Sequence, residues 1–124
     1  MKQIEIKAAI ENLIDTFLYA GKVSIELRKK GLIKEIKEDN TPVSNGDLEV
    51  NRILTEKINN LTPQIPIVSE ETSHNKSKKD LKNFWLIDPI DGTYDYINDL
   101  DEFTLNAGLI INNRAVAGLS LIHI

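Results

Sequence analysis

Two groups of carboxylates each follow a short apolar run, and this spacing could bring them to one place. Residues 65–69 precede Glu70 and Glu71, and residues 84–87 precede Asp88 and Asp91. Both runs have the length and composition of buried strands, and ligand sites in open sheets gather at strand ends. Carboxylates that meet there repel one another unless a cation lies between them. The pattern indicates a site for a hard cation such as Mg²⁺, which prefers oxygen ligands.

Residues 88–93, Asp-Pro-Ile-Asp-Gly-Thr, add a place for phosphate. Pro89 favours a turn directly after the first aspartate, so the two aspartates can face one centre with a backbone carbonyl between them. Gly92 permits a ligand to approach the backbone closely. Thr93 is expected to begin a short helix, whose free N–H groups and dipole attract an anion. Metal ligands and a phosphate cradle are therefore expected within one short segment.

Each feature also has a simpler interpretation. An acidic run such as that between residues 88 and 102 is commonly a solvated loop, and Asp95, Asp99 and Asp101 are expected to be solvated. Asp47 lies three residues after Ser44, so it could serve only a helix capping box, and Thr93 could be a plain N-cap. A calcium-binding module is a further alternative, although the spacing does not match the helix–loop–helix calcium loop.

Bulk composition narrows the possible functions. The chain has 124 residues, of which 41% are hydrophobic and 27% are charged, which suits one domain or part of one. Its net charge of −4 disfavours a nucleic-acid groove, so no nucleic-acid polymer is expected as a partner. The lack of cysteine excludes disulfides, thiolate nucleophiles and zinc–sulfur sites. No apolar run approaches roughly 18 residues and no signal peptide is visible, so we expect a cytoplasmic location without stable membrane insertion.

The elements that must position these residues follow from the hydrophobic pattern. Two amphipathic helices are predicted over residues 3–30 and 44–61, the second opened by Ser44 and Asp47. A turn is predicted at 38–43, a polar lysine-rich loop at 72–82 and a short helix at 93–98. Strands are predicted at residues 32–37, 65–69, 84–87, 103–112 and 115–124. The last strand stops in an apolar run, so we expect the chain to be truncated.

Three segments carry a family resemblance in the expected order: residues 41–47 (Thr-Pro-Val-Ser-Asn-Gly-Asp), 68–71 (Val-Ser-Glu-Glu) and 85–93 (Trp-Leu-Ile-Asp-Pro-Ile-Asp-Gly-Thr). The chain resembles the lithium-sensitive, magnesium-dependent phosphatase superfamily, which includes inositol monophosphatases and 3′(2′),5′-bisphosphate nucleotidases. Residues 61–63 (Leu-Thr-Pro) and 102–106 (Glu-Phe-Thr-Leu-Asn) favour the nucleotidase branch. Ser44 and Gly46 stand where this branch often has other small residues, and residues 94–96 (Tyr-Asp-Tyr) replace a basic-acidic-aromatic run.

The resemblance implies a ligand set for two or three Mg²⁺ ions in the complete enzyme. Glu70 and Asp88 would bind the first ion together with the carbonyl of Ile90. Asp88 and Asp91 would hold the second ion. The later aspartate that completes this second site in the family is expected beyond Ile124. Glu71 is expected to lie outside the ligand set.

The resemblance also implies catalytic and phosphate-binding roles. Asp47 and Thr93 would form a hydrogen-bonded pair that orients or deprotonates the attacking water. The backbone N–H groups of Gly92 and Thr93 would hold the phosphate. The full set implied to contact the phosphate is Glu70, Ile90, Asp91, Gly92 and Thr93.

The resemblance further implies an α+β fold. Residues 1–124 would form the N-terminal metal- and phosphate-binding domain, which is the N-terminal half of the layered α/β/α/β/α sugar-phosphatase fold, with long helices on an antiparallel sheet. The implied reaction is hydrolysis of 3′-phosphoadenosine 5′-phosphate to AMP and phosphate. An inositol or related sugar phosphate is the alternative small phosphorylated substrate. A fragment that binds metal without turnover is the alternative of another class, and the oligomeric state stays open.

Overall fold

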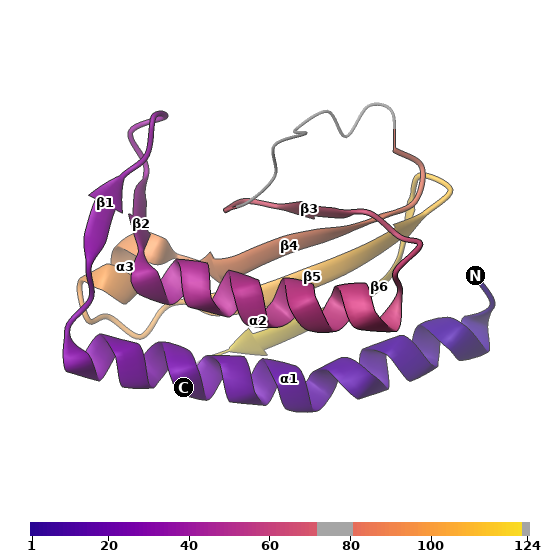
Figure 1. The fold of residues 1–124 in the computed structure, drawn as a ribbon, viewed down its shortest axis with the longest axis horizontal. Helices are drawn as coiled ribbons and strands as arrows, with labels where there is room; N and C mark the ends of the chain where they lie inside the picture. Colours follow the sequence, from indigo (N-terminus) through magenta and orange to yellow (C-terminus); the bar gives the residue numbers. More distant parts are fainter. Residues whose placement is uncertain (72–80, 123–124) are drawn as a thin grey trace.

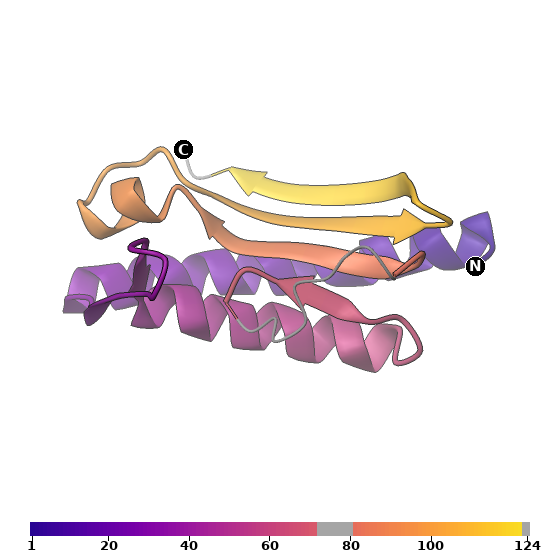
Figure 2. The same ribbon diagram turned by 90° about the horizontal axis from the view of Figure 1, so that it is seen from above.

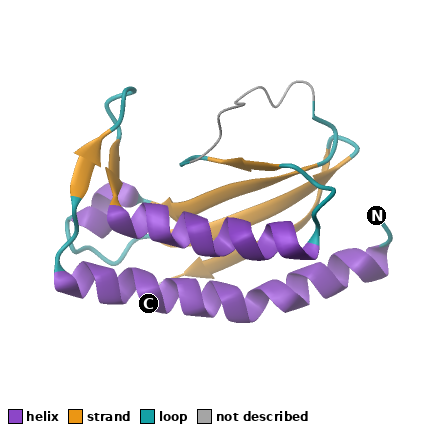
Figure 3. Cartoon of the chain, in the orientation of Figure 1, coloured by secondary structure: helices purple, strands orange, loops and turns teal. Residues whose placement is uncertain are grey.

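Two long helices lie on one face of a sheet in the computed structural model, which describes residues 1–71 and 81–122 (Figures 1 and 3). Viewed from above, both helices are on the same side of the strands (Figure 2). The elements in chain order are α1 (Gln3–Lys30), β1 (Lys34–Ile36), β2 (Pro42–Ser44), α2 (Asn45–Leu61), β3 (Ile67–Ser69), β4 (Phe84–Asp91), α3 (Thr93–Ile97), β5 (Thr104–Ile111) and β6 (Arg114–Ile122).

The helix α1 confirms the prediction over residues 3–30. Its buried side is built mostly from residues three or four apart, Ala9, Leu13, Phe17, Ala20 and Ser24, as an amphipathic helix requires. Basic residues in its last turn interact favourably with the negative end of the helix dipole. Gly31, with φ of 94°, ends the helix in a conformation that suits glycine.

The helix α2 begins where the capping pattern predicts. Ser44 is the N-cap, and its side chain accepts a hydrogen bond from the backbone N–H of Asp47. The Asp47 carboxylate in turn accepts a hydrogen bond from the backbone N–H of Ser44 at 2.9 Å. This reciprocal pair satisfies N–H groups that a helix start leaves without partners. The capping box therefore also fixes the position of Asp47.

The main sheet has the strand order β3-β4-β5-β6 and is mixed. The expected antiparallel arrangement is correct for β4, β5 and β6, but β3 pairs with β4 in parallel. Parallel neighbours need a long crossover between them, and the direction of pairing depends on that path rather than on the pattern of either strand. The expected antiparallel sheet is therefore a mixed one, because of the parallel strand β3.

A separate hairpin is formed by β1 and β2. The sequence predicts a turn over 38–43, but Pro42 already belongs to β2, so the turn is shorter than predicted. Proline is tolerated as the first residue of a strand because its missing N–H is then not required by the ladder.

The strand β4 continues through Asp91, well past the predicted end at residue 87. Its register with β5 shifts between Asp88 and Asp91, which marks a bulge or irregularity. Pro89 lies in this interval, where a missing donor does not break a regular ladder. The two aspartates of the motif therefore lie on either side of a local irregularity at the end of a strand.

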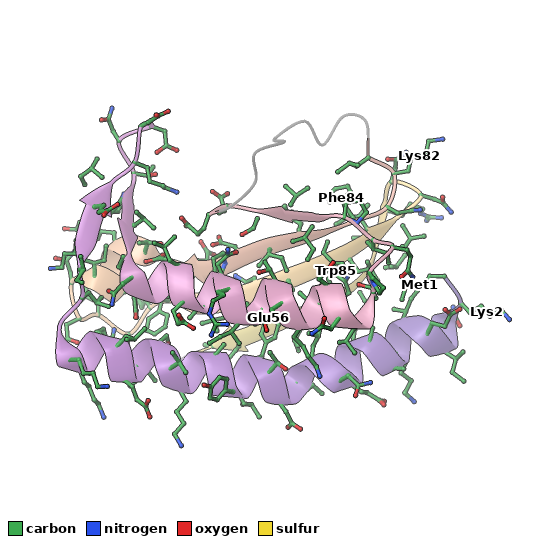
Figure 4. The ribbon with its side chains drawn as sticks, viewed as in Figure 1. Met1, Lys2, Glu56, Lys82, Phe84 and Trp85 are labelled. Carbon is green, nitrogen blue, oxygen red and sulfur yellow. The ribbon has the colours of Figure 1, made fainter. Side chains whose placement is uncertain are left out.

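The core lies between the sheet and the two long helices. Trp85 (labelled in Figure 4) is fully buried, as expected, and its Nε1 donates a hydrogen bond to Thr62 Oγ1 at 2.9 Å. This bond satisfies the one polar atom of the indole ring. Across the described residues, no helix has the combination of length and apolar character that spanning a membrane requires.

Candidate functional site

One open pocket collects residues from three separate parts of the chain. Its lining comes from the β1–β2 hairpin, the ends of β3 and β4, and α3. Figure 1 shows the hairpin and α3 at the same end of the ribbon. Its volume is about 370 Å³. The lining residues are Lys37, Asp39, Thr41, Pro42, Glu70, Glu71, Asp88, Ile90, Asp91, Gly92, Thr93 and Tyr94. Every predicted site residue except Asp47 lines this pocket, and Asp47 lies directly behind it, as described below.

Gly92 turns the chain from β4 into α3. Its φ is 90°, a left-handed conformation that side chains rarely adopt. A Cβ atom at this position would lie 2.7 Å from the backbone carbonyl oxygen of Glu102. Only glycine therefore fits between the end of β4 and the segment that precedes β5, and this fit brings Thr93 to the pocket.

Asp88 lies half-buried among other carboxylates. Burial is the largest cause that raises its pKa from 3.8 to about 6, followed by repulsion from Asp91 and Glu70 and then from Glu71 and Asp47. Like charges that meet in a poorly solvated place disfavour ionisation of one another. The strand ends therefore gather negative charge, as the sequence predicts.

The donor set at this place suits a hard divalent cation. Glu70, Asp88 and Asp91 supply carboxylate oxygens and Ile90 supplies a carbonyl, which are the ligand types that Mg²⁺ prefers. A cation among them would also relieve the repulsion felt by Asp88. Within residues 1–71 and 81–122, no three acidic or histidine side chains form a ready-made metal cluster. The ligand assignments therefore stay a prediction.

Thr93 and Asp47 form a hydrogen-bonded pair. Thr93 Oγ1 lies 2.8 Å from Asp47 Oδ1 and 3.0 Å from the carbonyl oxygen of Ile90. A hydroxyl has one proton, so it donates to only one of these acceptors at a time. When the proton points to Asp47, the lone pairs of the hydroxyl oxygen can accept a hydrogen bond from a water molecule in the pocket. This arrangement can orient a nucleophile.

The simpler interpretations of these two residues are settled by the same contacts. Asp47 is fully buried and makes both sets of contacts, because Oδ2 accepts the capping-box hydrogen bonds from Ser44 while Oδ1 accepts one from Thr93. Thr93 is not the N-cap of α3, since that position belongs to Gly92. The plain N-cap interpretation of Thr93 was therefore wrong: its side chain turns toward α2 instead of its own helix.

Lys37 is a pocket residue to which sequence analysis assigns no role. Its Nζ lies 3.6 Å from a carboxylate oxygen of Glu71, whose side chain is 5% exposed. Burial raises the pKa of Glu71, and Lys37 opposes this rise. No local signal marks Lys37, because only the folding of the β1–β2 hairpin brings it to the end of β3. Glu71 is thus an ion-paired, buried acid.

Two of the acids expected to be solvated have a partner. Asp99 and Asp101 are exposed, as predicted, but their carboxylates lie 3.3 and 3.1 Å from the guanidinium of Arg28 on α1. The sequence gives no hint of this pairing, since Arg28 is more than 70 positions away. The predicted loop at 72–82 falls largely outside the described residues.

Comparisons with known proteins identify a family and similar folds. The family model described as "Inositol monophosphatase family" matches residues 6–121. The chain is 43% identical over 106 residues to the 3′(2′),5′-bisphosphate nucleotidase CysQ of Haemophilus influenzae, covering 84% of this chain and 39% of that protein. It is 38% identical over 112 residues to CysQ of Aggregatibacter actinomycetemcomitans, covering 89% and 42%.

Solved structures with the same fold include an IMPase of Thermotoga maritima, with a TM-score of 0.79, 23% identity, and coverage of 91% of this chain and 43% of that one. The extragenic suppressor protein suhB of Bartonella henselae has a TM-score of 0.78 at 22% identity, covering 93% and 44%. These matches show the α+β fold, which confirms the predicted fold class. The chain spans about two fifths of the length of the curated relatives it matches.

Proposed function

This chain belongs to the inositol monophosphatase family, and on that premise we propose that it forms the N-terminal metal- and phosphate-binding domain of a magnesium-dependent phosphomonoesterase. The observation that carries the proposal is the contact between Thr93 and the buried Asp47, next to a pocket lined by Glu70, Asp88 and Asp91. A hydroxyl held by a buried carboxylate, beside clustered acids, suits the hydrolysis of a phosphate ester better than simple ion storage.

The acidic pocket would hold the metal ions. Glu70, Asp88 and the carbonyl of Ile90 would bind a first Mg²⁺, and Asp88 with Asp91 would bind a second. Bound ions of this kind lower the pKa of an attacking water and stabilise the charge on a leaving oxygen.

The remaining pocket residues would position the water and the phosphate. With its proton donated to Asp47, Thr93 Oγ1 would be free to accept a hydrogen bond from the attacking water. Gly92 lets the phosphate approach the backbone, where the N–H groups of Gly92 and Thr93 would donate to its oxygens. In the reaction, the water oxygen would form the new P–O bond while the bond between phosphorus and the ester oxygen breaks. One water proton would stay on the phosphate, and the other would end on the released ester oxygen.

We propose 3′-phosphoadenosine 5′-phosphate as the substrate of the complete enzyme, with AMP and phosphate as products. The support is the identity of 43% and 38% to two proteins named as 3′(2′),5′-bisphosphate nucleotidases. The two solved structures are under 25% identical and support the fold alone. An inositol phosphate is therefore the less supported substrate, and a cytoplasmic location remains part of the proposal.

The test compares this chain with any longer polypeptide that its gene encodes. Phosphate release from 3′-phosphoadenosine 5′-phosphate and from inositol 1-phosphate is measured with Mg²⁺ and again with EDTA. We expect Mg²⁺-dependent release in the longer protein, with the nucleotide preferred. Preference for inositol phosphate would overturn the substrate, and turnover that persists in EDTA would overturn the metal-dependent mechanism.

Metal binding without turnover is the competing function for the 124-residue chain itself, because it covers only 39% and 42% of the two relatives. Calorimetric titration with Mg²⁺ and with Ca²⁺ separates this from the calcium-module alternative. Phosphate release by the 124-residue chain alone would exclude the idea of an inactive fragment, and selective Ca²⁺ binding would support the module.

A further inference from the structure

Gly46 in the first turn of α2 lies against Tyr96 of α3. A Cβ atom on Gly46 would overlap the Tyr96 hydroxyl oxygen and would lie 2.8 Å from the ring carbons Cε2 and Cζ. Real Cβ atoms essentially never come so close to another heavy atom. The tyrosine ring therefore occupies the space that any side chain at position 46 would need.

Tyr96 cannot easily retreat from this contact. It is fully buried, and its hydroxyl donates a hydrogen bond to the backbone carbonyl of Ser24 on α1 at 2.6 Å. Its ring meets the ring of Phe103 edge-on, with the centroids 4.9 Å apart. The guanidinium of Arg28 lies 5.7 Å from the tyrosine ring centroid. Tyr96 is thus held by α1 and by the segment before β5 as well as by α2.

The contact between Gly46 and Tyr96 is close in the chain to the candidate water-orienting pair, Asp47 and Thr93. Asp47 follows Gly46 in the chain, and Thr93 begins the five-residue helix that contains Tyr96. The backbone N–H of Tyr96 donates to the carbonyl of Gly92 at 2.9 Å, so Tyr96 and Thr93 belong to the same helical turn. A shift of Tyr96 away from α2 would carry Thr93 away from Asp47.

We propose that Gly46 and Tyr96 are a matched positioning pair, which sets the separation between Thr93 Oγ1 and Asp47 Oδ1. Neither residue touches the substrate; both act through the two residues beside them. The catalytic consequence rests on the proposed phosphatase function, whereas the positional consequence does not. Because orientation in a reacting complex is sensitive to displacements of about 1 Å, even a small shift should lower the rate by about 10- to 100-fold.

The test is a double-mutant cycle with Gly46→Ala, Tyr96→Phe and the combination of both. In the longer polypeptide used to test the proposed function, Gly46→Ala should lower kcat for phosphate release by about tenfold or more, with KM changed by no more than about twofold. Tyr96→Phe loses the hydrogen bond to Ser24 but keeps the buried ring, so it should lower kcat by less than Gly46→Ala does. In the double variant, the overlapping hydroxyl is gone but the ring carbons remain 2.8 Å from the new Cβ. We therefore expect partial recovery of kcat relative to Gly46→Ala.

Gly21→Ala provides a matched control. A Cβ on this buried α1 glycine would overlap Leu121 Cδ2, so it creates a similar clash away from the pocket. We expect it to change the melting temperature while leaving kcat unchanged. The inference is overturned if Gly46→Ala keeps the wild-type kcat, if the double variant is no better than Gly46→Ala, or if Gly21→Ala loses kcat equally.

An NMR measurement on the 124-residue chain decides the positional claim without any turnover. The Asp47 amide and Thr93 methyl signals should move in Gly46→Ala and return toward wild type in the double variant. If the wild-type longer protein releases no phosphate, the proposed function fails, while these signals still test the pair. If Gly46→Ala does not fold, a folded double variant supports the pair, and an unfolded double variant overturns it.

Discussion

Asp88 is the side chain whose ionisation the candidate site opposes most clearly. Its pKa is raised from 3.8 to about 6, so the folded chain holds a proton that the unfolded chain releases. Stability should therefore fall as the pH rises between these two values. Above about pH 6, the full repulsion among the carboxylates is present unless a cation balances it.

Without Mg²⁺, Asp88→Asn should therefore raise the melting temperature at about pH 7.5 and leave it nearly unchanged at about pH 3.5, where both side chains are neutral. Thermal melts in EDTA measure this difference. Asp15→Asn, which removes an exposed carboxylate from α1, is the matched control and should have little effect at either pH. A lower melting temperature for Asp88→Asn near neutral pH would contradict the repulsion.

The same substitution should nearly abolish phosphate release by the longer protein, because Asp88 is the proposed ligand of both metal ions. The variant should still fold, because the same substitution is expected to stabilise the chain near neutral pH. Steady-state assays with saturating Mg²⁺ measure kcat, and circular dichroism checks the fold. Near-normal turnover in this variant would refute the metal assignment.

Two substitutions of Thr93 test the role of its hydroxyl group. Thr93→Val keeps the shape but leaves the buried Asp47 with one donor fewer, which should lower the free energy of unfolding by about 1–3 kcal/mol. Thr93→Val should also lower kcat strongly. Thr93→Ser retains the hydroxyl, so it should keep most of the free energy of unfolding and most of kcat. Urea denaturation and steady-state assays measure the two effects. Equal losses in the valine and serine variants would contradict this role, because the serine variant keeps the hydroxyl.

Residues 88–93 could be predicted as a site because their roles depend on short-range backbone features: a proline, a glycine and two carboxylates within six positions. The contact of Asp47 with Thr93 was predicted only through family resemblance, since the two lie 46 positions apart. Lys37 and Tyr96 were assigned no site role. Their importance comes from packing between distant segments, which leaves no mark on the neighbouring sequence.

Arg28 joins α1 to the segment between α3 and β5. Its guanidinium donates to the carbonyl of Leu100 at 2.8 Å, pairs with Asp99 and Asp101, and lies 5.1 Å from the centroid of the Phe103 ring. The Arg28 side chain is only 11% exposed, whereas the side chains of Asp99 and Asp101 are 86% and 69% exposed, so water screens the two ion pairs more than the stacking on Phe103. A planar guanidinium can satisfy them together, and an ammonium group cannot.

Arg28→Lys should therefore lower the free energy of unfolding by about 1–3 kcal/mol, because it loses the planar fork and the stacking together. Arg52→Lys is the matched control. Arg52 also pairs with two carboxylates, Glu49 and Glu56, but its side chain is 60% exposed, so little change is expected. Urea denaturation of both variants measures the difference. Equal effects would mean that burial of Arg28 adds nothing.

The helices could be predicted from the sequence because their signals are local. The spacing of Leu13 and Phe17, and the capping box at Ser44, are contained within a few turns. Strand β2 and the parallel pairing of β3 could not be predicted, because both depend on which segment lies alongside. The extension of β4 through Pro89 could not be predicted either. A regular strand pairing excludes proline, but the β4–β5 pairing is irregular between Asp88 and Asp91 and tolerates it.

Binding of Mg²⁺ should stabilise the chain as a whole. A ligand that binds only the folded state adds about 2.7 kcal/mol at 100 times its Kd. Differential scanning calorimetry should therefore show a melting temperature that rises with Mg²⁺ concentration and returns to its starting value in EDTA. The rise should be absent in Asp88→Asn. An identical rise in that variant would place the binding ions elsewhere.

The packing of α1 against β6 links the start of the described chain to its far end. A ribosome adds about 5–20 residues per second, so several seconds pass between the emergence of α1 and that of β6. During this interval α1 can pair with α2, which it also contacts, but the surface destined for β6 stays uncovered. Newly made chains should thus pass through a helical hairpin with exposed apolar side chains, which is the form that chaperones recognise and in which aggregation begins.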